Sequence, residues 1–104
     1  MLRSVNVYLH GTLTGNLVYA EGAYHFFYLK SYTGPPLSLS LPNNGKVHTS
    51  MDLHPFFHGL APEGWLRKRY SETQRIDETD ILGLLIENGN DLLGAVTLGP
   101  YDET

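Results

Sequence analysis

The chain has 104 residues, no cysteine, 41% hydrophobic residues and a formal net charge of −4 with an isoelectric point near 5.6. The length predicts a single domain over residues 1–104, and the composition is typical of a globular protein. The lack of cysteine excludes disulfides and thiolate metal sites, and the acidic balance disfavours independent nucleic-acid binding. Without a sustained apolar run at its amino terminus, the chain is expected to have no signal peptide or membrane span and to be cytoplasmic.

The first third of the sequence predicts an antiparallel meander of three strands. In SVNVYLHG, the apolar residues Val5, Val7 and Leu9 recur at every second position, as in a half-buried strand. Gly11 and Gly15 bracket a predicted turn, after which NLVYAEG and AYHFFYL supply the second and third strands. Short turns between consecutive strands favour antiparallel pairing.

A proline-rich segment follows in SYTGPPLSLSLPNNGK. The run Gly34-Pro35-Pro36 predicts irregular backbone, because proline lacks the amide donor that a central strand needs. Leu37, Leu39 and Leu41 then alternate with serines, and this period of two predicts a short strand or an extended edge segment.

The second half of the sequence predicts three helices and a final strand. The helices lie in LHPFFHGL, from Pro62-Glu63 to about Arg75, and in DILGLLIENG, and the strand is GAVTLGP. The candidate N-caps are Ser50 or Asp52 for the first helix and Asp77 or Thr79 for the third. This order predicts an α+β fold in which a small antiparallel sheet, the N-terminal meander plus the closing C-terminal strand, packs with about three helices.

The sequence contains few candidates for catalysis. His54 and His58 would share a helix face, but a zinc site needs further ligands, and Pro55 stands where a metalloprotease helix has glutamate. GTLTG matches neither a phosphate-binding loop nor the dinucleotide fingerprint, and no nucleophile elbow is present. We therefore expect no metal, no cofactor and no catalytic residue.

The helix in LAPEGWLRKRY carries the single tryptophan of the chain, Trp65. On a helical wheel Leu66 and Tyr70 form the natural core stripe, and Trp65 falls about a quarter-turn aside, near Arg69. Trp65 could close the border of the core with Arg69 across its ring, or it could anchor a partner, since tryptophan and arginine are enriched at binding hot spots. The spacing leaves both interpretations open and slightly favours the first.

Several segments together resemble one family. VNVYLHGTLTGNL, HFFYLKSY, PLSLSLP, FFHGLAPEGWLRKRY and ETDILGLLIENGNDLLGAVTLGP resemble, in order, the N-terminal subdomain of HipA-like serine/threonine kinases, the toxins of bacterial toxin–antitoxin modules. PLSLSLP, LAPEG and GNDLLGAVTLGP are the most specific pieces. Family members more often have Leu-Pro-Glu/Asp where this chain has Ala61-Pro62-Glu63, and tryptophan at position 65 is not a general family feature.

The resemblance implies a non-enzymatic antitoxin. A separate N-terminal subdomain is similar to the HipS antitoxin of three-component HipBST systems, which implies two partners: a HipT-type kinase, and a HipB-type DNA-binding component in a ternary complex. Because the motif-bearing kinase body is not part of the sequence, no catalytic residue carries over. A chain without a covalent tether needs its own anchors, and Trp65, Lys68 and Arg69 are the predicted partner contacts. Alternatively, the chain completes or activates a split kinase, or is a piece of a longer one.

Overall fold

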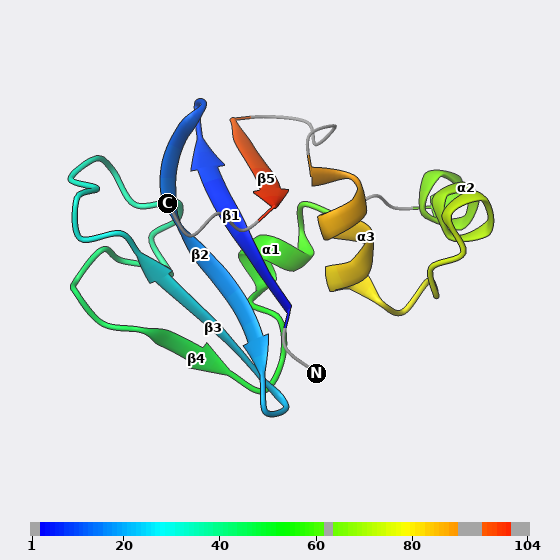
Figure 1. Ribbon diagram of the computed structural model, residues 1–104, viewed down its shortest axis with the longest axis horizontal. Coiled ribbons are helices and arrows are strands. Elements are labelled where there is room, and N and C mark those ends of the chain that lie inside the picture. Colours follow the sequence, from blue (N-terminus) through cyan, green and yellow to red (C-terminus); the bar gives the residue numbers. More distant parts are fainter. Residues whose placement is uncertain (1–2, 62–63, 90–94, 101–104) are drawn as a thin grey trace.

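The computed structural model describes residues 3–61, 64–89 and 95–100, and the side chains of residues 64, 65 and 100 lie outside the described part. The described residues form, in chain order, β1 (Arg3–Leu9), β2 (Thr12–Ala20), β3 (Ala23–Tyr28), β4 (His48–Ser50), α1 (Pro55–His58), α2 (Gly64–Gln74), α3 (Ile81–Glu87) and β5 (Val96–Pro100) (Figure 1). The predicted α+β class is confirmed, with strands first, helices second and a closing strand.

The strands form one antiparallel sheet in the order β4-β3-β2-β1-β5. The meander of β1, β2 and β3 is confirmed, and β5 pairs with β1 so that Leu98 lies opposite Val7. The β1–β2 connection has positive φ at His10 (51°) and Gly11 (79°). This backbone suits the tight hairpin turns that match the natural twist of paired strands.

Gly15 is not at the edge of the first turn, as the sequence suggested, but inside β2, which begins at Thr12. A Cβ atom at position 15 would lie 2.4 Å from the carbonyl oxygen of Phe27 and 3.0 Å from the ring of Phe26. The glycine therefore permits a close approach between β2 and β3 within the sheet.

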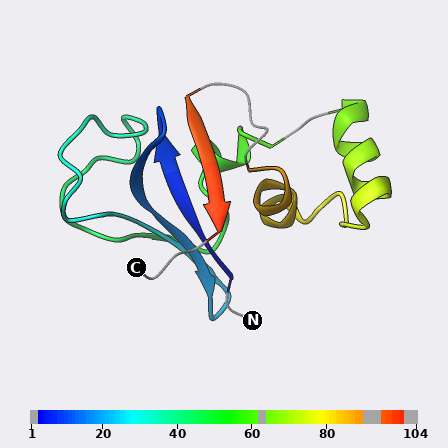
Figure 2. The same ribbon diagram turned by 45° about the horizontal axis from the view of Figure 1, so that its top comes forward.

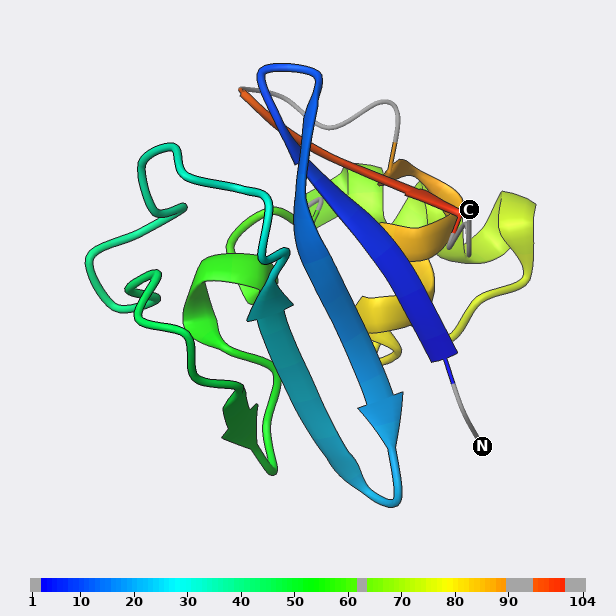
Figure 3. The ribbon, with the colours of Figure 1, turned by 60° about the vertical axis from the view of Figure 1, so that its left-hand side comes forward.

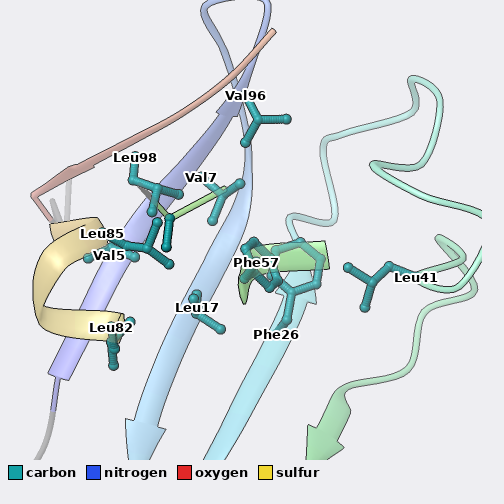
Figure 4. Packing of buried hydrophobic residues seen from close by; sticks show 11 residues of the cluster. Val5, Val7, Leu17, Phe26, Leu41, Phe57, Leu82, Leu85, Val96 and Leu98 are labelled. Atoms are coloured by element: carbon teal, nitrogen blue, oxygen red, sulfur yellow. The ribbon is translucent and has the colours of Figure 1, made fainter. Parts of the chain in front are cut away.

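One face of the sheet is covered by α1 and α3, and in Figure 3 the strands lie in front of these helices. Phe57 from α1 and Leu82 and Leu85 from α3 pack against apolar side chains of the strands (Figure 4). The buried cluster comprises Val5, Val7, Leu17, Phe26, Leu41, Phe57, Ala61, Leu82, Leu85, Val96 and Leu98. The alternation in the first strand correctly identified Val5 and Val7 as core residues.

The predicted strand over Leu37–Leu41 is wrong. The amide of Leu41 donates to the carbonyl of Ser38 at 3.0 Å, which closes a tight turn instead of an extended strand. Leu41 is fully buried and Leu37 packs against the core, whereas Leu39 at the tip of the turn is 97% exposed. The edge strand is instead β4, whose three residues are too few to give a sequence pattern.

The N-cap of α1 is His54, not Ser50 or Asp52. The Nδ1 atom of His54 accepts a hydrogen bond from the amide of Phe56 at 3.0 Å, and Pro55 fills the first helical position. Proline there loses no hydrogen bond, because the first amides of a helix have no intrahelical partner. Ser50 is part of β4, so the sequence placed this helix start too early.

The N-cap of α3 is Asp80, not Asp77 or Thr79. Its carboxylate accepts from the amide of Gly83 at 3.0 Å and from both terminal nitrogens of Arg3 at 2.9 Å, which fixes α3 to the start of β1. Asp77 is engaged in a local turn, where it accepts from the amide and the hydroxyl of Thr79. The Arg3 hydrogen bonds lower the pKa of Asp80 from its ordinary value.

Candidate partner-binding surface on α2

Helix α2 lies apart from the sheet, with α3 between them (Figure 2). None of its described side chains, those of residues 66–74, is buried. Leu66 and Tyr70, predicted to face the core, are half-buried and lie outside the core cluster. Because α3 already covers the sheet next to β1 and β5, α2 is left as an outer element with little of its surface enclosed.

A polar connection from α2 to the rest of the fold lies at its carboxyl end. The amide groups of Gln74 and Asn88 exchange two hydrogen bonds of 2.8 and 2.9 Å, and Asn88 is only 4% exposed. The hydroxyl of Ser71 donates to the carbonyl of Ile76. Arg75 adopts a φ of 57°, the left-handed conformation that commonly ends helices. The helix is thus held at its carboxyl end.

Two of the three predicted contact residues have described side chains. Lys68 and Arg69 are both exposed, and the ion pair recorded within the described part of the chain, Arg3–Asp80, involves neither of them. Position 65 belongs to α2, but the side chain of Trp65 lies outside the described residues. Residues three and four positions apart share one face of a helix, so the backbone of α2 brings positions 65, 68 and 69 to the same face.

The described side chains of this face include two exposed cations, Lys68 and Arg69. Two adjacent cations on an exposed helix can pair with carboxylates and can speed the approach of an acidic partner. No group of three or more potential metal ligands occurs among the residues that the structure describes. The arrangement is therefore suited to binding another macromolecule.

The titratable groups with shifted pKa values have structural roles. Hydrogen bonding to Arg3 lowers the pKa of Asp80, and burial raises the pKa values of Tyr24 and Tyr28. The Tyr28 hydroxyl accepts from the amide of Leu37 and donates to the carbonyl of Leu41, so it holds the loop after β3 in place. His54, considered from the sequence as a zinc ligand and judged unsuitable, is the N-cap of α1.

One hollow of the described surface was missed by the sequence reasoning. It lies beside the end of β3, and its lining includes Lys30, Tyr32 and Lys46. The sequence shows a charge pattern in this region, with no aspartate or glutamate from residue 22 to residue 51, but it contains no signal for the hollow itself. In the part of the chain that is described, no helix is long and apolar enough to cross a membrane.

Comparisons with family models, known sequences and solved structures point to the same family. The sequence model of the family described as "HipA N-terminal domain" matches residues 5–99. The chain is similar to an uncharacterized protein of Haemophilus influenzae, with 43% identity over 98 residues that cover 94% of this chain and 92% of the relative. It is also 29% identical to the putative kinase Y4mE of Sinorhizobium fredii, and that match covers 98% of this chain but 26% of the kinase.

Among solved structures, the fold is similar to one described as the N-terminal domain of HipA toxin. The TM-score is 0.80 at 38% sequence identity, and the match covers 100% of this chain and 97% of that one. The likeness therefore extends over the whole fold.

Proposed function

The chain belongs to the HipA N-terminal domain family, a family with a toxin–antitoxin context, and from this membership we propose that it binds a HipA-like serine/threonine kinase of the HipT type and neutralises it. One observation carries the proposal. The same domain makes up 26% of a putative kinase in S. fredii and 92% of a relative in H. influenzae. A domain found both within a kinase-length chain and as nearly the whole of another protein is suited to binding a kinase as a separate chain.

Binding in trans needs a surface that a tethered domain does not. A covalent tether keeps two domains at high effective concentration, whereas two free proteins lose translational and rotational freedom on association. Contacts at the interface must offset that loss. The proposed contacts are Trp65 as an apolar anchor and Lys68 and Arg69 as cations that pair with an acidic groove on the kinase.

Neutralisation follows if the docked domain favours an inactive kinase. A ligand shifts a conformational equilibrium only by binding one state more tightly than the other, so α2 must fit the inactive arrangement better. Direct obstruction is the other route, in which the anchor fills space that ATP or the substrate needs. Inclusion of a HipB-type DNA-binding component would make the complex ternary.

The opposite effect on the kinase is the second candidate function. The chain could complete a split kinase and make it active, since in the S. fredii relative this domain is part of the putative kinase itself. Co-expression separates the two functions. Growth arrest by the kinase alone, relieved by this chain, supports neutralisation, whereas arrest that needs both chains supports completion.

Residue-level variants test the surface on α2. Removing a tryptophan or arginine hot spot costs about 2 kcal/mol or more, so Trp65→Ala should bind the kinase roughly 30-fold more weakly and restore toxicity. The double change Lys68→Glu with Arg69→Glu should slow association. Met51→Ala, a 76% exposed apolar residue outside α2, is the control and should bind like the parent. A folded Trp65→Ala variant that protects fully refutes the anchor, and an unfolded one places Trp65 in the structure of the domain.

A further inference from the structure

The loop between β3 and β4, residues 29–47, is long but firmly held. Connections of this length without regular structure are uncommon in small domains and are often functional. Tyr28 binds the loop at Leu37 and Leu41 through its hydroxyl, and the side-chain amide of Asn43 donates to the carbonyl of Tyr32 at 3.1 Å. The loop is thus a shaped surface, which lowers the entropy cost of binding.

The charge on this part of the chain is one-sided. The protein has 11 acidic residues and a net charge of −4, yet none of the acidic residues lies between residues 22 and 51. Lys30 and Lys46 lie in this interval, and both are exposed. Since the ion pair recorded among described residues is Arg3–Asp80, both ammonium groups are available to an outside carboxylate.

The two lysines line the same hollow. It has a volume of about 590 Å³, and its walls include the half-buried rings of Tyr28 and Tyr32 and the exposed side chain of Val47. The two tyrosine rings stack with their centroids 5.9 Å apart and their planes 11° apart. An apolar floor with cations at its margin suits an apolar side chain flanked by carboxylates.

The hollow is remote from α2. In Figures 1 and 2 the loop and α2 lie at opposite ends of the molecule, whose longest extent is 39 Å. The loop is therefore not part of the α2 face, and it needs an explanation separate from the α2 contacts.

We propose that loop 29–47 is a second docking surface, which binds an acidic segment of a protein, with an apolar side chain of that segment in the hollow and its carboxylates on Lys30 and Lys46. Charge complementarity selects this occupant. Nucleic acid fits less well, because two lysines neutralise few phosphates and the chain as a whole repels them. With surfaces at both ends, the protein can hold two protein segments at once.

A peptide titration tests this surface without the kinase. The probe is the peptide acetyl-Glu-Asp-Leu-Glu-Asp-amide, added to about 5 mM to the isotope-labelled protein at low salt and followed by amide chemical shifts, since millimolar affinities are weak but measurable this way. The comparison ligands are the same peptide with lysine at the four acidic positions and an eight-nucleotide thymidine oligomer. We expect the acidic peptide alone to shift the amides of residues 27–32 and 43–47.

Two double variants with equal charge locate the effect. Each Lys→Glu or Arg→Glu exchange lowers the charge by 2, so K30E/K46E and K68E/R69E both take the protein from −4 to −8. Measured from the amide shifts of residues 27–32 and 43–47, K30E/K46E should bind the peptide at least about tenfold more weakly, and K68E/R69E should keep the affinity at the loop within about twofold of the parent. No shift at the loop, equal loss in both variants, or binding of the oligomer in preference to the acidic peptide would each overturn the proposal.

Discussion

The leucines at positions 39 and 41 provide a matched test of how the loop is built. Both are leucine, they lie two residues apart in one tight turn, and one is 97% exposed while the other is fully buried. Truncating Leu41 to alanine removes three carbon groups from the core, at ~0.8 kcal/mol each, or about 2.4 kcal/mol before any cavity is counted. Leu39→Ala removes the same atoms from solvent and should change the free energy of unfolding by less than about 0.5 kcal/mol.

The cavity left by Leu41→Ala should destabilise the fold further, but by less than a fully enclosed cavity of the same size would. Leu41 borders a hollow of about 340 Å³ that is also lined by the polar residues His48, Thr49 and Ser50, so water can reach the vacated space. We therefore expect a total loss of about 3 kcal/mol, near the lower end of measured leucine-to-alanine changes in cores. In a domain of this size, such a loss lowers the melting temperature by about 15 °C.

Urea unfolding followed by circular dichroism gives both free energies. The expected difference between the two variants is about 2.5 kcal/mol, with unchanged denaturant slopes. Similar losses in the two variants, or a loss above about 1 kcal/mol for Leu39→Ala, would show that the turn does not direct Leu41 inward and Leu39 outward. The description of loop 29–47 as a firmly held surface would then fail.

Three further changes test other contacts. Asp80→Ala should cost about 1–2 kcal/mol by urea unfolding, because it removes a helix cap and the Arg3 pair, and Asp80→Asn should cost less because asparagine still caps. Since the folded-state pKa of Asp80 is lowered, its stabilisation is complete above the ordinary value of 3.8 and is lost as the pH falls below it, and a pH series of melts of parent and Asp80→Asn should converge there. Gln74→Ala removes the donor to the Oδ1 atom of the buried Asn88, whose Nδ2 atom keeps its hydrogen bond to the carbonyl of Leu84. The change should cost about 1–2 kcal/mol, with faster hydrogen exchange in α2. Gly15→Ala should cost about 1–3 kcal/mol in thermal melts, because its methyl group meets the neighbouring strand.

The sheet was the most predictable part of the fold. The alternation of apolar and polar residues in β1 is a local pattern that can be read from a few consecutive positions. Val5 and Val7 could therefore be assigned to the core from the pattern alone. The alternation over Leu37–Leu41 is an equally local pattern, and it led to a wrong prediction of a strand because contacts from outside the segment help to shape it. A hydrogen bond from the amide of Leu41 to the carbonyl of Ser38 reverses the chain, and the Tyr28 hydroxyl that supports the turn comes from the end of β3.

Helix caps could not be chosen from the sequence because several candidates competed. Asp77, Thr79 and Asp80 are all capping types. Asp80, which caps α3, is also bound by Arg3, and Arg3 lies 77 residues away in the chain. The proposed partner surface on α2 could be assigned from the sequence only in part. Helical spacing places positions 65, 68 and 69 on one face, but the exposure of that face depends on α3 lying between α2 and the sheet.

Phosphate transfer by the kinase itself tests the proposed function most directly. A purified HipA-like kinase without this domain is incubated with ATP, and its phosphorylation rate is measured while the protein is added in increasing amounts. The account predicts a stable complex of one kinase with one copy of this chain and a rate that falls to background at the equivalence point. The Kd fitted to the Trp65→Ala curve should be roughly 30-fold higher than that of the parent. An unchanged rate, or a rate that rises as the protein is added, would contradict it.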